Sequence, residues 1–131
     1  GEGAGITGVI MNQQTVDIFN PKTIRATMGS IFRVPFVYVP ELSTVLTQMH
    51  ERGIHTYAAH LKGQKYYDSF SFREPTAFLI GNEGNGLTKE ISDQAGQYLK
   101  IPMEGKVESL NASIAAALLM YEAHRQRSAR L

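Results

Sequence analysis

The sequence predicts an α/β fold, a doubly wound parallel sheet with helices on both faces. Two observations support this prediction. First, short runs along the chain are apolar throughout, as in strands buried on both faces. Second, these runs alternate with segments whose apolar residues recur at helical spacing. Crossover helices between parallel strands cover both faces of such a sheet. The length of 131 residues, 43% of them hydrophobic, predicts a single domain over residues 1–131.

The predicted elements follow one another in a regular order. The apolar runs predict strands at residues 6–11, 34–39, 54–59, 76–80 and 98–101. Helices are predicted to begin at Asn20-Pro21, Leu42, Thr88 and Leu110, with the last running to about Arg127. Gly53 is expected to end the second helix. Residues 60–75 have no clear period and are expected to form a long surface connection.

Composition excludes several classes of protein. Thirteen Lys and Arg against twelve Asp and Glu give a net charge of +1, so RNA could be bound only by local patches. Without cysteine there is no disulfide, thiolate zinc site or cysteine nucleophile. The longest apolar run, residues 114–121, is far shorter than the roughly 20 residues that cross a bilayer. We therefore expect a soluble, cytoplasmic protein without a membrane partner.

A glycine-rich segment follows the fourth predicted strand. Gly81, Gly86 and Thr88 fit the spacing of a phosphate-binding loop, but Leu87 stands where that loop requires lysine. Glu83 would also repel a triphosphate, so a nucleotide-phosphate-binding domain is disfavoured. The simplest alternative is a turn in which Thr88 caps the next helix. The glutamate, which a turn does not need, favours a binding site.

The segment before the last helix contains two good N-cap residues, Ser109 and Asn111, and we expect one of them to cap. Alanines at positions 112 and 115–117 permit close packing against a neighbouring element or subunit. The helix ends in cations that either complement its dipole or contact RNA. These cations are His124, Arg125, Arg127 and Arg130.

These motifs resemble those of the SpoU (TrmH-like) branch of the SPOUT RNA methyltransferases. Residues 77–87, AFLIGNEGNGL, are similar to the family's second motif. Residues 101–103, IPM, and 109–111, SLN, are similar to its third motif. Residues 20–30 resemble another run common in the family, and the resemblance covers roughly residues 6–127.

The resemblance implies a fold, a reaction and a site. The implied fold ends in a C-terminal trefoil knot, and the implied reaction transfers a methyl group from S-adenosylmethionine to a ribose 2′-hydroxyl of rRNA or tRNA. A homodimer is implied, and no metal is required. The implied cofactor contacts are Gly81, Ile101, Met103, Leu110 and Ala59, the last with the loop that follows it. The implied polar residues of the reaction centre are Glu83, Ser109 and Asn111.

The family's first motif has no counterpart in this sequence. Its arginine is tied to activation of the ribose hydroxyl, and the motif would precede residue 1, which we expect to be the edge of a fragment. We therefore expect slow methyl transfer by these 131 residues alone. The alternative function is an RNA-binding or dimerisation module that keeps the fold without turnover. Arg25 and Arg33 do not occupy that motif and are expected at the surface or against RNA.

Two further patterns have competing interpretations. Histidines recur every five residues, at positions 50, 55 and 60, whereas paired helical ligands are four apart, so we expect no metal site. Tyr66 and Tyr67 stand near Lys62 and Lys65. These tyrosines could stack on single-stranded RNA or anchor the loop.

Overall fold

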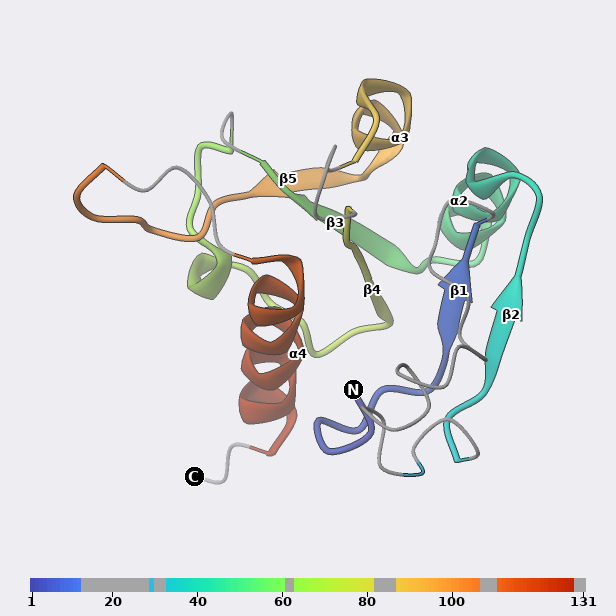
Figure 1. The fold of residues 1–131 in the computed structure, drawn as a ribbon, viewed down its shortest axis with the longest axis horizontal. Helices are drawn as coiled ribbons and strands as arrows, with labels where there is room; N and C mark the ends of the chain where they lie inside the picture. The colour runs from blue at the N-terminus through green and yellow to red at the C-terminus, as the bar shows by residue number, and fades with distance from the viewer. Residues whose placement is uncertain (13–28, 30–32, 61–62, 82–86, 107–110, 129–131) are drawn as a thin grey trace. The chain divides into compact units, whose positions relative to one another are not determined.

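The computed structural model describes residues 1–12, 29, 33–60, 63–81, 87–106 and 111–128 (Figure 1). Its contacts divide the chain into two compact units, Gly1–Leu42 and Ser43–Leu131. Each unit is described by itself. The second unit contains all the predicted site residues.

The first unit contains a pair of parallel strands, β1 (Val9–Met11) and β2 (Phe36–Tyr38). Both strands were predicted, although each is shorter than its apolar run. Near them, the Arg33 guanidinium pairs with the carboxylate of Glu2, with Nη2 2.8 Å from Oε1. Arg33 is thus a surface residue with an intramolecular partner. Arg25 and the helix predicted from Asn20 lie outside the described residues.

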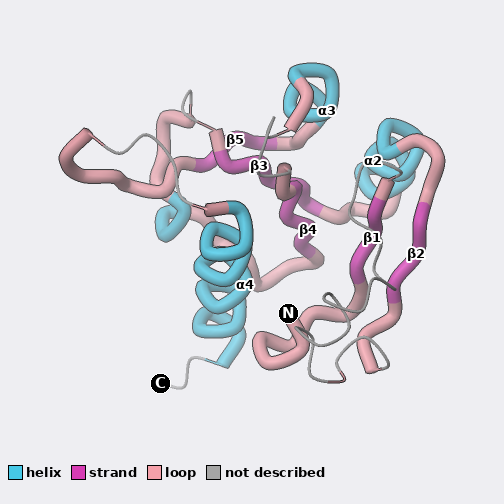
Figure 2. The backbone as a smooth tube through the Cα atoms, in the orientation of Figure 1, coloured by secondary structure: helices cyan, strands magenta, loops and turns pink. Residues whose placement is uncertain are grey.

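The second unit is built on a three-stranded parallel sheet (Figure 2). Its strands are β3 (His55–Ala59), β4 (Thr76–Leu79) and β5 (Gln97–Leu99), in the order β4-β3-β5. Tyr57 of β3 is in register with Phe78 on one side and Gln97 on the other. All three predicted strands are confirmed. Since the strands are parallel, their carboxyl ends lie at one edge of the sheet.

Helix α2 (Leu42–Glu51) ends where its sequence predicts. Gly53 has a φ of +74°, a left-handed conformation that glycine adopts without a Cβ clash. Its N–H donates to the carbonyl of His50, and the N–H of Ile54 donates to that of Met49 at 2.9 Å. These bonds satisfy carbonyls at the end of the helix, which is the C-terminal motif that the glycine indicates.

Helices contact both faces of this sheet. The neighbouring residues Thr56 and Tyr57 of β3 point to opposite faces because side chains alternate along a strand. Thr56 Oγ1 lies 2.8 Å from Nε2 of His50, which belongs to α2. Tyr57 packs instead with Leu119 of α4 (Ala112–Ser128), the last helix of the chain. The two helices therefore cover opposite faces.

The core of this unit includes residues from the segment that was expected to be a surface connection. Phe72 is fully buried with Tyr57, Leu99 and Leu119. Its ring centroid lies 5.0 Å from those of both Tyr57 and Phe78, in edge-to-face geometry. The expectation was wrong at this point because the segment is mostly irregular, apart from a short 3₁₀ turn, η2 (Tyr67–Ser69), and so gives no periodic signal. A buried phenylalanine nonetheless contributes about 1.5–3 kcal/mol.

Candidate functional site

The carboxyl edge of the three-stranded sheet contains the described residues of the predicted cofactor site. Ala59 ends β3, Gly81 follows β4, and Ile101 and Met103 follow β5. All four are half-buried. The parallel pairing thus places three segments that are distant in sequence at one edge, where ligands bind in open α/β sheets. Glu83, Ser109 and Leu110 lie outside the described residues.

The loop after Ala59 packs tightly against the end of β5. A Cβ atom on Gly63 would lie 2.9 Å from the backbone carbon of Leu99 and 3.1 Å from the carbonyl oxygen of His60. The Gly63 N–H also donates to that His60 carbonyl at 3.0 Å. Only glycine fits this close backbone approach. Sequence analysis did not identify Gly63, and its one signal was a glycine in an otherwise polar loop.

Asn111 caps helix α4. Its Oδ1 accepts hydrogen bonds from the backbone N–H groups of Ser113 at 2.9 Å and Ile114 at 3.4 Å. The Ser113 hydroxyl donates to the same oxygen at 2.7 Å. The expectation that Ser109 or Asn111 caps the helix is confirmed for Asn111. The cap fixes this amide at the entrance to α4, and its role in the reaction stays a prediction.

Thr88 caps helix α3 (Lys89–Gln94). Its Oγ1 accepts a hydrogen bond from the N–H of Ile91 at 3.3 Å. The helix predicted from Thr88 and the capping role of this threonine are both confirmed. The glycine-rich segment therefore leads from β4 to a capped helix, as the turn interpretation requires, and its glutamate remains to be explained.

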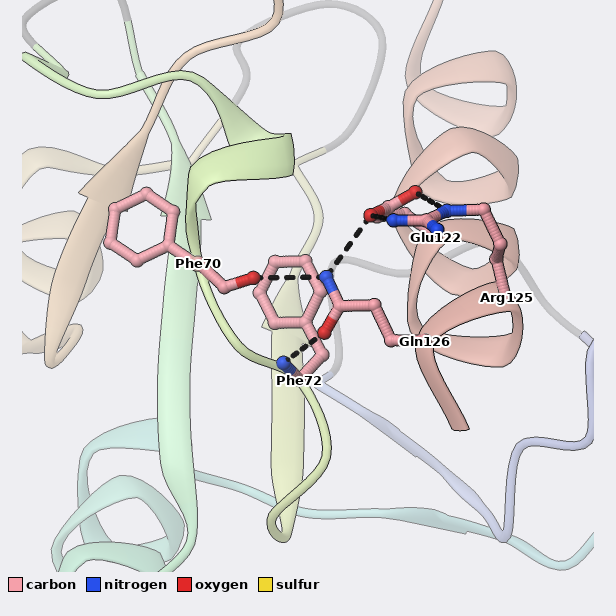
Figure 3. A network of polar contacts seen from close by, with 5 residues as sticks. All are labelled: Phe70, Phe72, Glu122, Arg125 and Gln126. Carbon is pink, nitrogen blue, oxygen red and sulfur yellow. Dashed lines mark hydrogen bonds and ion pairs between the residues drawn. The ribbon is translucent and has the colours of Figure 1, made fainter. Parts of the chain in front are cut away.

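Hydrogen bonds join the C-terminal end of α4 to the segment before β4 (Figure 3). Gln126 Oε1 accepts from the Phe72 N–H at 2.6 Å, and its Nε2 donates to the Phe70 carbonyl at 2.9 Å. The Arg127 guanidinium donates to the carbonyls of Phe72 and Glu74, each at 2.8 Å. Arg127 was expected to complement the helix dipole or to contact RNA. It lies in the last turn of α4, where a cation complements the dipole, and its guanidinium also binds protein backbone.

The neighbouring cation Arg125 has a carboxylate partner. Its guanidinium binds Glu122 bidentately, with Nη2 2.7 Å from Oε1 and Nε 2.9 Å from Oε2. This hydrogen bonding lowers the pKa of the Glu122 carboxyl, against a smaller opposing effect of burial. A third hydrogen bond to the same carboxylate comes from Nε2 of Gln126 at 3.0 Å. Arg125 is therefore partly neutralised within the helix.

The three histidines have separate partners. His50 bonds to Thr56, His55 pairs with Glu74 at 2.9 Å, and the ring of His60 stacks on Tyr98 with centroids 4.6 Å apart. Within the described ranges, no three His, Asp or Glu side chains are grouped as metal ligands. Over the same ranges, no helix has the apolar length to cross a bilayer.

Sequence comparison identifies relatives along almost the whole chain. Residues 2–121 match the model of the SpoU rRNA Methylase family. A putative TrmH family tRNA/rRNA methyltransferase of Staphylococcus haemolyticus is 34% identical over 126 residues, which are 96% of this chain and 51% of that protein. The putative TrmH family methyltransferase YacO of Bacillus subtilis is 32% identical over 97% of this chain and 51% of its own. The chain thus spans about half the length of these curated relatives.

Solved structures match the fold equally well. The SpoU methyltransferase AviRb of Streptomyces viridochromogenes, in complex with the cofactor AdoMet, superposes with a TM-score of 0.88 at 34% identity, covering 96% of this chain and 52% of that one. The AdoMet-bound rRNA methyltransferase of Sinorhizobium meliloti gives 0.86 at 32% identity, covering 98% and 49%. These matches confirm the predicted α/β fold with parallel strands.

Proposed function

Because the chain belongs to the SpoU rRNA Methylase family, we propose that it forms the cofactor-binding part of an RNA methyltransferase that uses S-adenosylmethionine. The acceptor is a ribose 2′-hydroxyl of rRNA or tRNA. The observation that carries the proposal is the edge formed by the ends of β3, β4 and β5, in a chain that superposes over 96% of its length on AdoMet-bound AviRb. A solved RNA 2′-O ribose methyltransferase, with a TM-score of 0.83 at 33% identity, supports the type of reaction.

The residues of this edge fit the proposed cofactor. We infer that Ala59, Gly81, Ile101 and Met103, together with Leu110, contact it. The four described members are small or apolar and half-buried, and none is charged. A flat, uncharged adenine is recognised by such walls and by backbone N–H and carbonyl groups, whereas a triphosphate needs cations. When bound, S-adenosylmethionine supplies a methyl group that is already activated by its sulfonium.

The protein's own contribution is positioning and proton removal. A ribose hydroxyl is a poor nucleophile, so it must be held in line with the methyl group and lose its proton as the new bond forms. We infer that Glu83, Ser109 and Asn111 hold the hydroxyl and its surroundings. A glutamate with its reference pKa of about 4.3 is a weak base, so Glu83 serves better as a hydrogen-bond acceptor. The cap at α4 supports the assignment of Asn111, because it immobilises that side chain.

Two measurements test the proposal. Titration calorimetry should show tighter binding of S-adenosylmethionine than of ATP, and preference for ATP would contradict the cofactor assignment. Incorporation of tritiated methyl groups into bulk rRNA and tRNA should be detectable with a longer protein in which the family's first motif is joined ahead of these residues, and slow with this chain. If the chain is instead an RNA-binding module without turnover, both this chain and the longer protein should bind RNA but incorporate no methyl groups.

Asn111 allows the reaction to be separated from folding. Asn111→Asp keeps an N-cap of equal quality, so stability should be unchanged, while the amide donor is lost. We expect methyl transfer by the longer protein to fall about 10- to 100-fold, within the range for lost positioning groups. Asn111→Ala should lose the cap as well, at about 1 kcal/mol of stability. Full activity of Asn111→Asp would remove Asn111 from the reaction centre.

We also propose a homodimer formed through α4. Ile114, Leu118 and Tyr121 lie on one face of this helix and are 54%, 37% and 54% exposed. They line a shallow groove with Ala117. Three further alanines near the start of α4, at positions 112, 115 and 116, share the helix face of Leu119, which is buried against the sheet. The apolar residues, rather than these alanines, are therefore the candidates for subunit contact.

Light scattering tests the dimer. Leu118→Glu should produce monomers, because a carboxylate in an apolar interface cannot be solvated. Gln48→Glu introduces the same charge at an exposed position of α2 and should leave the mass unchanged. A wild-type chain that is monomeric at high concentration would refute the dimer, and a dimer that survives Leu118→Glu would place the interface elsewhere.

The finer features of the fold are part of the same proposal. We infer a doubly wound sheet, within one domain, and a C-terminal trefoil knot. The superposition on the SpoU methyltransferase AviRb supports this inference, because the resemblance to that family implies the knot. A crystal structure of the chain with S-adenosylmethionine would test it by tracing residues 82–111. The absence of cysteine supports a cytoplasmic location, where the proposed RNA substrates are found.

A further inference from the structure

Two adjacent tyrosines have different environments. Tyr67 is half-buried and packs against the core formed by Tyr57, Phe72, Leu99 and Leu119. Tyr66 is 50% exposed. Of the two interpretations left open by the sequence, Tyr67 therefore takes the role of loop anchor, and Tyr66 has no such role in the core.

Tyr66 lies beside the end of β5. It forms a parallel bridge with Lys100, in which the Lys100 N–H donates to the carbonyl of Lys65 and the Tyr67 N–H donates to the carbonyl of Lys100, both at 2.9 Å. The Leu99 carbonyl, by contrast, accepts from His60 on the β3 side. The segment that contains Tyr66 therefore runs along the outer edge of β5 (Figure 1).

The pairing determines where the side chains point. Leu99 is buried on the core side of the sheet, so Lys100 points to the opposite side, as does Tyr98. Residues paired across a ladder present their side chains to the same side, so the side chains of Tyr66 and Lys100 leave the backbone on one side of the bridge. Tyr98, which stacks on His60 with ring centroids 4.6 Å apart, points to that side as well. An exposed aromatic ring and a cation thus share one side of the chain just before Ile101.

We propose that Tyr66 and Lys100, the Tyr66–Lys100 patch, hold a single-stranded segment of the substrate RNA beside the cofactor site. The proposal rests on the proposed function. An exposed tyrosine ring stacks on any nucleobase, and a neighbouring ammonium group neutralises a backbone phosphate. The chain has a net charge of only +1, so RNA affinity must come from such a local arrangement.

Fluorescence anisotropy with a labelled oligouridine tests the patch on the intact chain. Tyr66→Ala should weaken binding between about fivefold and a hundredfold, the effect of losing one stacked base. Tyr66→Phe should bind as the wild type does, and Tyr66→Leu should bind as Tyr66→Ala does, because leucine keeps bulk but cannot stack. A duplex of equal charge should compete poorly, because its bases are already stacked.

The salt dependence separates the two residues. Lys100→Ala should reduce the slope of log affinity against log salt by about 0.7, the value for one phosphate of a single strand. Tyr66→Ala should leave the slope unchanged. Lys89→Ala, which removes a cation from the exposed start of α3, is the matched control and should change neither slope nor affinity.

Three outcomes would refute the proposed role of the Tyr66–Lys100 patch. The wild-type chain does not bind oligouridine, Tyr66→Ala binds it with unchanged affinity, or Lys89→Ala and Lys100→Ala lose equal affinity for it. Calorimetry with S-adenosylmethionine on the same variants keeps the two proposals distinct. Normal cofactor binding with no effect of Tyr66→Ala on RNA would refute the patch alone. Absent cofactor binding with RNA affinity that depends on Tyr66 would refute the proposed cofactor and leave the patch supported.

Discussion

Replacing Gln126 by alanine should measure how strongly the hydrogen bonds of this side chain attach α4 to the segment before β4. Its side-chain amide makes one hydrogen bond to the backbone of Phe72 and one to the backbone of Phe70. These residues lie 54 and 56 positions away in sequence. Phe72 is fully buried, so its N–H loses an acceptor where water does not readily replace it. An unsatisfied buried donor costs about 1–3 kcal/mol, and the second bond contributes about 1 kcal/mol.

Alanine is a slightly better helix former than glutamine, and this difference offsets the loss by less than about 0.5 kcal/mol. We therefore expect Gln126→Ala to lower the free energy of unfolding by about 2–3 kcal/mol. With a urea m-value of about 2 kcal/mol/M for a chain of this size, the midpoint should fall by about 1 M or somewhat more. Gln48→Ala, at an exposed position of helix α2, is the matched control and should have almost no effect. A difference between the two variants below about 0.5 kcal/mol would refute this account of the hydrogen bonds.

Gln126→Glu gives the same test a dependence on pH. The ionised carboxyl can still accept from the Phe72 N–H, but it cannot donate to the Phe70 carbonyl, and it faces the carboxylate of Glu122. The Glu122 carboxylate, and the Phe70 carbonyl that only the protonated carboxyl can donate to, raise the folded-state pKa of the carboxyl at position 126 above its unfolded value, against the opposing effect of the Phe72 N–H. The variant should then gain stability relative to the wild type as the pH falls from 7 to 5. If the variant gains no stability relative to the wild type between pH 7 and pH 5, the assigned geometry is contradicted.

Two further predictions concern Glu122 and Gly63. The bond to Arg125 lowers the pKa of Glu122 in the folded state. The ion pair therefore stabilises the fold fully above the unfolded pKa of about 4.3, and this stabilisation is lost as the pH falls through the lower folded-state pKa. Thermal unfolding of Glu122→Gln should therefore change less between pH 5 and pH 3 than that of the wild type, and parallel curves would count against this ion pair. Gly63→Ala should destabilise by about 1–3 kcal/mol in urea, since its Cβ would meet the Leu99 backbone at 2.9 Å, and wild-type stability would show that the loop can move away.

The regular elements were predictable because each has its own local signal. The strands at 55–59 and 76–79 lie in short, mostly apolar segments, and Gly53 and Thr88 mark helix ends through their own backbone and side-chain chemistry. The contribution of Phe72 to the core was not predictable, because it depends on residues distant in sequence. A phenylalanine in an irregular segment carries no information about which element will cover it.

The same reasoning applies to the candidate site. The edge of the sheet that we propose as the cofactor site could be predicted as an edge, because parallel strands bring their carboxyl ends together whatever their side chains. Asn111 was recognised, together with Ser109, as one of two candidate capping residues from its type and its place before an apolar helix. The backbone contacts of Arg127 were missed because their acceptors are carbonyls, which are present at every position and leave no pattern in a sequence. The difference between Tyr66 and Tyr67 likewise depends on a bridge to Lys100 that no local spacing shows.

The burial of Leu119 among Tyr57, Phe72 and Leu99 has a consequence for how the protein is made. A ribosome that has completed β5 has produced every strand of the three-stranded sheet, but the residue that closes its aromatic core is still to be synthesised. Until α4 has left the exit tunnel, that core faces solvent, and such exposed apolar surface is what chaperones bind and what drives aggregation. The speed at which this last helix emerges and docks therefore sets how long each new molecule remains vulnerable.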